Sequence, residues 1–201
     1  MVLGLPRGGV PVAYEVATAL SAPVDIVLSR KLVVPDRPWL IFGVLGEGGI
    51  HITDRDFGDR ASISDIERDK VAREQREQLR LSVVRYRLGV PHLRLAGLIA
   101  VIVDDGIATG ATANLACNIA RARGADQVVF ATPVGSCRPV RALTAVADHV
   151  ICLEIPQLFG PIRPWYSDFT EVTDVEARAL LDRANENLST PSLVGAVPLT
   201  S

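Results

Sequence analysis

The stretch from Leu98 to Ala113 constrains the fold more than any other part of the chain. It begins with an apolar, largely β-branched run over 98–103, which predicts a buried strand of a parallel sheet. Two adjacent carboxylates, Asp104 and Asp105, follow the strand and precede a short loop. Apolar residues then recur at helical spacing up to Gly124, which predicts a helix that ends there. The stretch therefore predicts a strand, a loop and a helix in direct succession.

The loop between this strand and this helix has the composition of an anion site. Backbone N–H groups at a helix N-terminus favour a phosphate, and small or hydroxyl-bearing residues leave them accessible. The loop residues are Gly106, Ala108, Thr109, Gly110, Ala111 and Thr112. The loop lacks the Gly-Lys-Ser/Thr ending of a P-loop and the G-x-G-x-x-G spacing. Because carboxylates repel phosphate, Asp104 and Asp105 must contact another part of the same ligand, either two sugar hydroxyls or a hydrated Mg²⁺.

The sequence from Val101 to Ala113 closely resembles the phosphoribosyl-pyrophosphate (PRPP) signature of the type I phosphoribosyltransferases. The resemblance implies that Asp104 and Asp105 hold the 2′- and 3′-hydroxyls of the ribose. It also implies that the loop from Gly106 to Thr112 wraps the 5′-phosphate. An ordinary strand–turn–helix is the alternative, but it has no use for two carboxylates ahead of an anion-binding turn.

A second strand–turn–helix unit stands at the start of the chain. Residues 2–5 predict a strand, and residues 10–20 predict a helix with Pro11 near its first turn. Between them, Arg7 offers a planar cationic fork that suits phosphate, although alone it is more typical of an exposed loop residue. The resemblance implies that Arg7, Gly8 and Gly9 form the pyrophosphate loop of the family.

Basic residues also follow the next apolar strand, which we expect over 24–29. Arg30 and Lys31 come at its carboxyl end, where open α/β sheets bind their ligands. A solvated strand end is the alternative, whereas the resemblance implies that both residues contact the pyrophosphate. The resemblance then makes Asp104, Asp105, Arg7 and Lys31 the catalytic residues.

Apolar runs predict five strands, over 2–5, 24–29, 98–103, 127–132 and 149–153. Helical patterns alternate with them, which predicts an α/β fold with a five-stranded, mainly parallel, Rossmann-like sheet and helices on both faces. Five strands are also what the resemblance implies. We expect a core over 1–157 that includes a helical arm at about 55–95, a C-terminal hood with a closing helix over 158–188, and a flexible tail over 189–201.

The segment 64–87 differs from the core helices because it is charged almost all round. Ser64 and Glu67 form a capping box that starts a helix. Few apolar residues occur before Leu79, so the first half is not expected to be a core helix. The pattern predicts an exposed arm above the sheet or a contact to a second subunit in a homodimer. Residues 85–87, Arg-Tyr-Arg, form either a solvated basic face or a further contact to pyrophosphate.

The resemblance implies Mg²⁺ as the cofactor, bound together with PRPP. Asp104 and Asp105 are candidates to contact this ion. Glu47 lies in a glycine-rich hairpin over 43–53. It is either a catalytic or Mg²⁺-ordering carboxylate or an ordinary surface residue of a turn.

Aromatic residues gather in the segment 158–169, which proline and glycine make an ordered loop rather than a helix. Trp165, Tyr166 and Phe169 offer flat faces that stack a planar base. The family uses a variable hood for this purpose, which makes the three residues candidates for acceptor binding. A hydrophobic clasp over the sheet edge is the equal alternative.

Composition excludes several function classes. The net charge of −2 argues against broad binding to nucleic acid or anionic membranes. The three cysteines have no metal-ligand spacing and predict reduced thiols. Because no apolar run reaches transmembrane length and no signal-peptide pattern opens the chain, we expect a cytoplasmic protein.

These features and the resemblance predict a phosphoribosyltransferase that transfers the 5-phosphoribosyl group of Mg²⁺-PRPP to a nitrogenous base or similar acceptor and releases pyrophosphate. Ala108 stands where the 6-oxopurine enzymes of the family carry an aspartate, which disfavours hypoxanthine and guanine. The Arg-Gly-Gly-Val-Pro turn and the Trp-Tyr-x-Asp-Phe tail resemble a phosphoribosyltransferase-like group whose acceptor is not established. Two other classes stay open: a PRPP-binding regulatory protein without catalysis, and a sugar-phosphate hydrolase or phosphotransferase.

Overall fold

The computed structural model describes residues 1–53, 63–87 and 94–189 of the chain. Five parallel strands form the central sheet, in the order β2 (Val24–Ile26), β1 (Val2–Gly4), β6 (Ile99–Val103), β7 (Gln127–Val134) and β8 (His149–Glu154). The predicted five-stranded parallel sheet is therefore confirmed. The two strands that precede the glycine-containing loops, β1 and β6, are direct neighbours in it.

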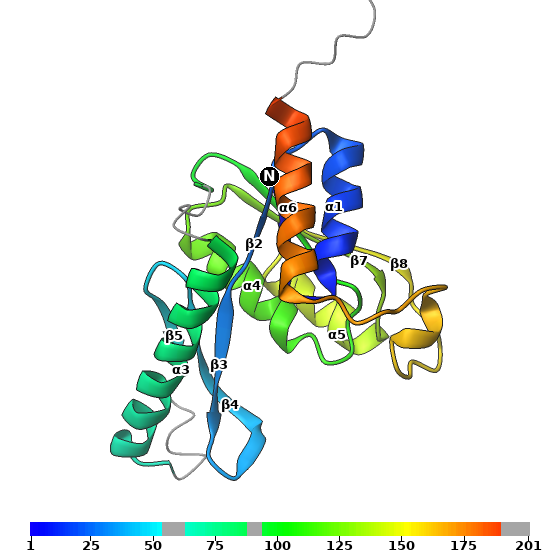
Figure 1. Ribbon diagram of the computed structural model, residues 1–201. Coiled ribbons are helices and arrows are strands. Elements are labelled where there is room, and N and C mark those ends of the chain that lie inside the picture. The colour runs from blue at the N-terminus through cyan, green and yellow to red at the C-terminus, as the bar shows by residue number, and fades with distance from the viewer. Residues whose placement is uncertain (54–62, 88–93, 190–201) are drawn as a thin grey trace, which may run out of the picture.

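Helices cover both faces of this sheet (Figure 1). On one face α1 (Gly9–Leu20) lies beside α6 (Asp174–Ser189), and on the other lies α4 (Ala111–Ala122). Successive side chains of a strand point to opposite faces. Val2 accordingly belongs to the hydrophobic cluster of α1 and α6, and Leu3 to the cluster of α4. Two apolar layers thus fix the ends of β1 and β6 in place.

The C-terminal part of the chain returns to the core. After β7 the chain forms the short helix α5 (Cys137–Ala142) and the 3₁₀ turn η1 (Leu143–Ala145), and a second 3₁₀ turn, η2 (Arg163–Trp165), follows β8. A capping box starts α6, because the Thr173 N–H donates to Glu176 Oε2 at 2.8 Å and the Glu176 N–H donates to Thr173 Oγ1 at 3.2 Å. α6 runs to Ser189, beyond the expected closing helix. The rest of the expected tail, 190–201, lies outside the described residues.

A second sheet is antiparallel and contains β3 (Ser29–Val34), β4 (Arg37–Gly46) and β5 (Ile50–Thr53). The strand expected over 24–29 therefore ends at Ile26, and Arg30 and Lys31 lie inside β3 rather than beyond a strand end. The apolar run continues unbroken across the change of sheet at 27–28, so the sequence carries no signal for it. The hairpin expected over 43–53 is formed by β4 and β5.

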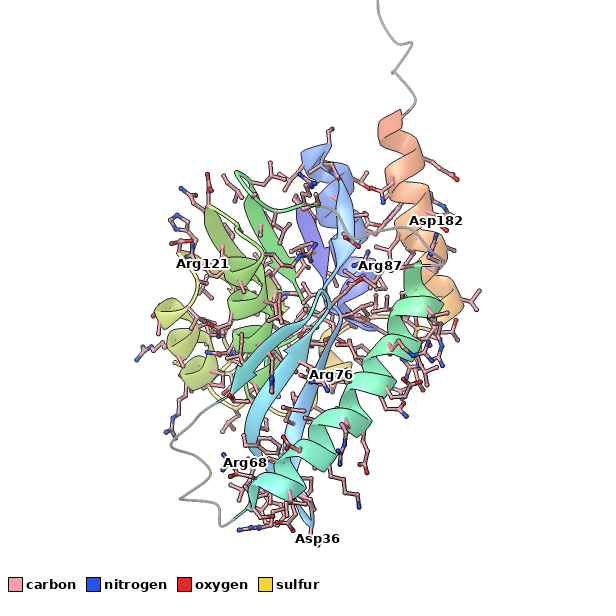
Figure 2. The ribbon with its side chains drawn as sticks, turned by 90° about the vertical axis from the view of Figure 1, so that its left-hand side faces the viewer. Asp36, Arg68, Arg76, Arg87, Arg121 and Asp182 are labelled. Atoms are coloured by element: carbon pink, nitrogen blue, oxygen red, sulfur yellow. The ribbon has the colours of Figure 1, made fainter. Side chains whose placement is uncertain are left out.

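α3 (Asp65–Arg87) lies along this antiparallel sheet (Figure 2). Its predicted capping box is confirmed, because the Ser64 N–H donates to Glu67 Oε2 at 3.0 Å. The expectation that its first half takes no part in a core is wrong, since Val71 and Ala72 are buried in the cluster that also holds Leu32. Residues 54–62 and 88–93 of the expected arm lie outside the described residues.

Among the described residues, no helix combines the length and the apolar character that crossing a bilayer requires.

Candidate active site

Two loops meet at the carboxyl ends of β1 and β6. Asp104 and Asp105 follow Val103, whose strand partner is Gly4. A Cβ atom on Gly8 would lie 2.1 Å from Asp105 Oδ2, and one on Gly9 would lie 2.7 Å from the Val103 carbonyl oxygen. Only glycine permits such an approach, so the loop after β1 lies directly against the acidic pair. The Pro6–Arg7 peptide of this loop is cis.

The two carboxylates are half-buried and act on one another. The pKa of Asp104 is raised well above its ordinary range, first by burial and then by the charge of Asp105, while Lys31 acts in the opposite direction. Burial also raises the pKa of Asp105. A ligand that brings hydroxyl donors or a cation relieves this repulsion. The acidic pair is therefore chemically suited to a sugar diol or a hydrated cation.

The loop between β6 and α4 is held on its inner side. The Ile107 N–H donates to the Val134 carbonyl at 3.0 Å, which ties the loop to the end of β7. Gly110 precedes α4 with a φ of +74°, which favours glycine. Ala108 and Thr109 are exposed. The first turn of α4 presents N–H groups that have no partner within the helix, so this loop has the geometry of a phosphate site.

A cavity of about 700 Å³ lies beside these loops and gathers the cations expected from the sequence. Arg7, Arg30 and Lys31 line it together with Thr112 of the second loop. Arg30 Nη2 donates to Ser82 Oγ of α3 at 2.6 Å, which holds this side chain along the wall. The structure thus brings residues from three separate segments of the chain to one cavity, whose excess of cations suits a polyphosphate.

Sequence reasoning missed Asp174 and left it open whether Arg85 and Tyr86 belong to this cavity. Arg85 and Tyr86, at the end of α3, and Asp174, at the start of α6, also line it. Arg85 Nη1 pairs with Asp174 Oδ2 at 2.6 Å, and the Tyr86 hydroxyl donates to Asp174 Oδ1 at 2.7 Å. The sequence marks Asp174 only as the start of a helix after Thr173, which gives no signal that it faces a ligand site. Arg85 and Tyr86 were expected either in such a contact or on a solvated face.

The aromatic segment forms a second cavity, of about 590 Å³, on the other side of Arg7. Tyr166 and Phe169 line it, with ring centroids 5.3 Å apart. The Tyr166 hydroxyl donates to the Asp105 carbonyl oxygen at 2.6 Å, which connects this cavity to the acidic pair. Trp165 is 44% exposed and, unlike the other two, is not among the residues that line the cavity. It closes η2, whereas Tyr166 follows in extended conformation.

Glu47 has a role that neither expectation described. It is buried, and its carboxylate accepts hydrogen bonds from Arg87, whose Nη2 lies 2.7 Å from Oε2. Arg87 Nη1 also donates to Asp25 Oδ1 of β2 at 2.7 Å. Burial acts to lower the pKa of Arg87, but Glu47 and Asp25 together raise it. Glu47 is therefore not a surface turn residue, and Arg87 at the end of α3 is not part of a solvated face (Figure 2).

The fold and the two loops place the chain in the class of parallel α/β proteins whose ligand site lies at the carboxyl ends of the strands. No profile of a known protein family matches it. Two curated proteins of Mycobacterium tuberculosis, from strains H37Rv and CDC 1551, are both named "Putative phosphoribosyl transferase". Each is 46% identical over 196 residues, or 98% of this chain, and the chain spans 44% of their length.

A solved structure extends this comparison to three dimensions. The crystal structure of TT1426 from Thermus thermophilus superimposes with a TM-score of 0.81 at 40% identity, over 90% of this chain and 85% of that chain. The chain belongs to the phosphoribosyltransferase family.

Proposed function

We propose that this protein is a phosphoribosyltransferase that takes Mg²⁺-PRPP as donor, transfers the 5-phosphoribosyl group to a nitrogenous base or similar small acceptor, and releases pyrophosphate. The observation that carries the proposal is the contact of Gly8 and Gly9 with Asp104 and Asp105. This contact puts an anion-type loop, an acidic pair and the N-terminus of α4 within one site. A pentose with a phosphate at each end is the ligand that uses all three.

Each end of PRPP has its own binding surface. The loop from Gly106 to Thr112 and the first turn of α4 receive the 5′-phosphate. Asp104 and Asp105 accept hydrogen bonds from the ribose 2′- and 3′-hydroxyls. The pyrophosphate enters the cavity lined by Arg7, Arg30 and Lys31. Holding both ends fixes the sugar carbon C1′ between them.

The residues present fit an Mg²⁺ ion that binds together with PRPP rather than one held by the protein alone. Among the described residues there is no cluster of three acidic, histidine or cysteine side chains that holds a metal alone. Asp104 and Asp105 would hold the ion through their carboxylate oxygens, a ligand type that Mg²⁺ prefers. When bound, the ion neutralises charge that develops on the leaving pyrophosphate.

In the transfer, the C1′–O bond to pyrophosphate breaks and a C1′–N bond to the acceptor forms, while the acceptor nitrogen loses a proton. The sugar passes through a state with oxocarbenium character, as in glycoside cleavage. The charges of Asp104 and Asp105 favour the positive sugar ring, and the cations of the cavity stabilise the leaving group. Placement of the reactants contributes on the order of 7–11 kcal/mol in favourable cases.

The acceptor binds in the cavity lined by Tyr166 and Phe169, which opens next to Asp105 and Arg7. Flat aromatic faces and a nearby cation suit a planar nitrogen heterocycle. The names of the Mycobacterium proteins support this function. Because those proteins are more than twice as long as this chain, the proposal rests on the site of the chain itself.

Two measurements test the proposal. Calorimetric titration with Mg²⁺-PRPP is expected to give micromolar-scale affinity, and a panel of bases and amines is expected to contain one that releases pyrophosphate. Absence of PRPP binding contradicts the proposal. Tight binding without release for any acceptor favours a regulatory PRPP-binding protein instead.

A further inference from the structure

Two of the arginines that line the cavity of about 700 Å³ are paired with carboxylates from one short segment of the chain. Arg7 Nη2 lies 2.5 Å from Glu171 Oε1, and Arg85 Nη1 lies 2.6 Å from Asp174 Oδ2. Glu171 and Asp174 stand three positions apart where the aromatic segment leads into α6. We call residues 171–174 the acidic segment. It supplies a carboxylate to arginines of two separate elements, because Arg7 lies in the loop after β1 and Arg85 lies in the last turn of α3.

These ion pairs face solvent and are suited to exchange. The side chains of Arg7 and Glu171 are 46% and 79% exposed, and those of Arg85 and Asp174 are 63% and 25% exposed. Ion pairs of this kind add little to stability. The buried pairs of Arg87, with side chains 9% exposed or less, are the contrast within the same molecule. Replacing the carboxylate partners of Arg7 and Arg85 by another anion therefore costs little.

We propose that Glu171 and Asp174 are internal counter-anions which a bound phosphate group displaces, and that Arg85 is a further anion-binding residue of the cavity. The inference deepens the proposed function, on which it rests for the identity of the anion. The ion pairs with the acidic segment hold the side chains of Arg7 and Arg85 in place before the anion binds. A pyrophosphate group takes over both arginines and leaves the two carboxylates to water.

The charges of the cavity favour this exchange. Pyrophosphate offers several oxygens in fixed geometry, so one group contacts Arg7, Lys31 and Arg85 at once, and phosphate–arginine contacts are frequently bidentate. Hydrogen bonds from Tyr86 and Arg85 lower the pKa of Asp174, so this carboxylate is charged and competes with an incoming anion. The acidic segment consequently sets how strongly the empty cavity resists small anions.

The exchange also reaches the second cavity. Arg7 and Glu171 line the cavity of Tyr166 and Phe169 as well as forming the ion pair. When phosphate takes Arg7, the Glu171 carboxylate is left to solvent at the edge of this cavity. Binding of the donor then adds an unpaired carboxylate to the acceptor cavity, which favours acceptors with N–H donors.

The test measures the affinity for inorganic pyrophosphate by isothermal titration calorimetry at low salt. Asp174→Asn and Glu171→Gln are each expected to bind pyrophosphate about two- to fivefold more tightly than the unchanged protein, the range that an exposed ion pair supports. Arg85→Gln is expected to bind it more weakly. A purely structural role for the acidic segment predicts no gain in either acid variant.

The chain offers closely matched controls. Asp65, like Asp174, is the first residue of a helix with a capping box, and it pairs with Arg68 at 2.7 Å. Glu77 pairs with Arg80 on α3 at 2.7 Å, as Glu171 does with Arg7. Asp65→Asn and Glu77→Gln remove the same charge without touching the cavity, so their affinity for pyrophosphate is expected to stay unchanged.

Every result separates the inference from the proposed function. Unchanged or weaker pyrophosphate binding in Asp174→Asn and Glu171→Gln overturns the inference, even if the protein turns over PRPP. The same holds if neither the unchanged protein nor the variants bind pyrophosphate. Equal gains in the control variants also overturn it, since a general charge effect then explains them. Tighter binding confined to the two cavity variants supports it, even if no acceptor releases pyrophosphate.

Discussion

Two pairs of carboxylates in this protein are withdrawn from solvent, and their surroundings are opposite. Asp25 and Glu47 are buried on either side of Arg87, which donates hydrogen bonds to both. Asp104 and Asp105 are neighbours in the chain, the glycines after β1 lie directly against them, and the Asp105 N–H donates to Asp104 Oδ1 at 3.0 Å. The first pair is balanced by a cation within the fold. The second pair keeps its repulsion, and the pKa of Asp104 is raised first by burial and then by the charge of Asp105.

The difference separates scaffold from site. A buried carboxylate with an arginine partner is complete without a ligand, and its loss of solvation is offset inside the protein. A half-buried pair of like charges is incomplete, and hydrogen-bond donors from outside are needed to offset it. By this criterion Asp25, Glu47 and Arg87 hold α3 to the core, whereas Asp104 and Asp105 have the surroundings that the proposed ligand site requires.

The largest effect is expected when both charges of the site are removed. The double variant Asp104→Asn/Asp105→Asn is expected to lose Mg²⁺-PRPP affinity by roughly 100-fold or more, because hydrogen bonds to charged groups each contribute about 1.5–3 kcal/mol. Calorimetric titration measures this loss. Inorganic pyrophosphate is the control ligand, since it has no ribose and its affinity is expected to hold or to improve. Unchanged PRPP binding in the double variant removes the diol assignment.

Removing the cation of the scaffold pair tests the other side of the comparison. Arg87→Met is expected to lower the free energy of unfolding by about 3–5 kcal/mol, because it removes the guanidinium group that donates to two buried carboxylates. Urea denaturation followed by circular dichroism measures the change. Arg80→Met is the matched control on the same helix, where an exposed pair with Glu77 is lost and little change is expected. A small effect at Arg87 contradicts its assignment to the scaffold.

The two regions also differ in how far the sequence predicts them. Each of the two loops, 7–9 and 104–112, is a single continuous stretch of chain. Its chemistry is set by neighbours in the sequence, so the local pattern predicts it. The contacts of Arg87 join it to residues 40 and 62 positions away. Arg87 stands in a charged run, which is typical of a solvated helix end. For this reason the sequence favours a solvated face for Arg87. Pairing at such separation depends on how two sheets pack and leaves no local pattern.

The acidic segment shows the same limit within the site itself. Glu171 and Asp174 belong to the start of a helix as far as the sequence indicates, and only the position of α6 against α1 brings them to Arg7 and Arg85. Trp165, Tyr166 and Phe169 are predicted as a group from composition. The end of η2 at Trp165 then decides which of them enter the cavity. Composition identifies the segment, whereas backbone geometry selects the residues.

A smaller effect is expected in the pH dependence of stability. The raised pKa of Asp104 means that the folded protein binds this proton more tightly than the unfolded chain does. Stability is therefore lost as the pH rises from the ordinary carboxyl range, about pH 4, through the raised pKa. Asp104→Asn removes this loss, so its melting temperature is expected to exceed that of the unchanged protein at pH 7 and to match it near pH 4. A variant that is less stable at pH 7 contradicts the claim that the pair is uncompensated.

The smallest effect is expected at the hydrogen bond that positions the acidic pair from outside. Tyr166→Phe removes a hydroxyl that donates to the Asp105 carbonyl oxygen at 2.6 Å and keeps the ring against Phe169. We expect PRPP affinity to fall about two- to tenfold, since an ordinary hydrogen bond contributes roughly 0.5–1.5 kcal/mol. Trp165→Phe is the control, because it changes the adjacent aromatic residue outside the cavity, and its PRPP affinity is expected to stay unchanged.

If both variants lose affinity equally, the aromatic segment acts as a hydrophobic clasp, and Asp105 is positioned by its own loop. If Tyr166→Phe alone loses affinity, the acidic pair depends on a main-chain hydrogen bond for its geometry. The carboxylates of Asp25 and Glu47, by contrast, are positioned by hydrogen bonds from the guanidinium group of Arg87.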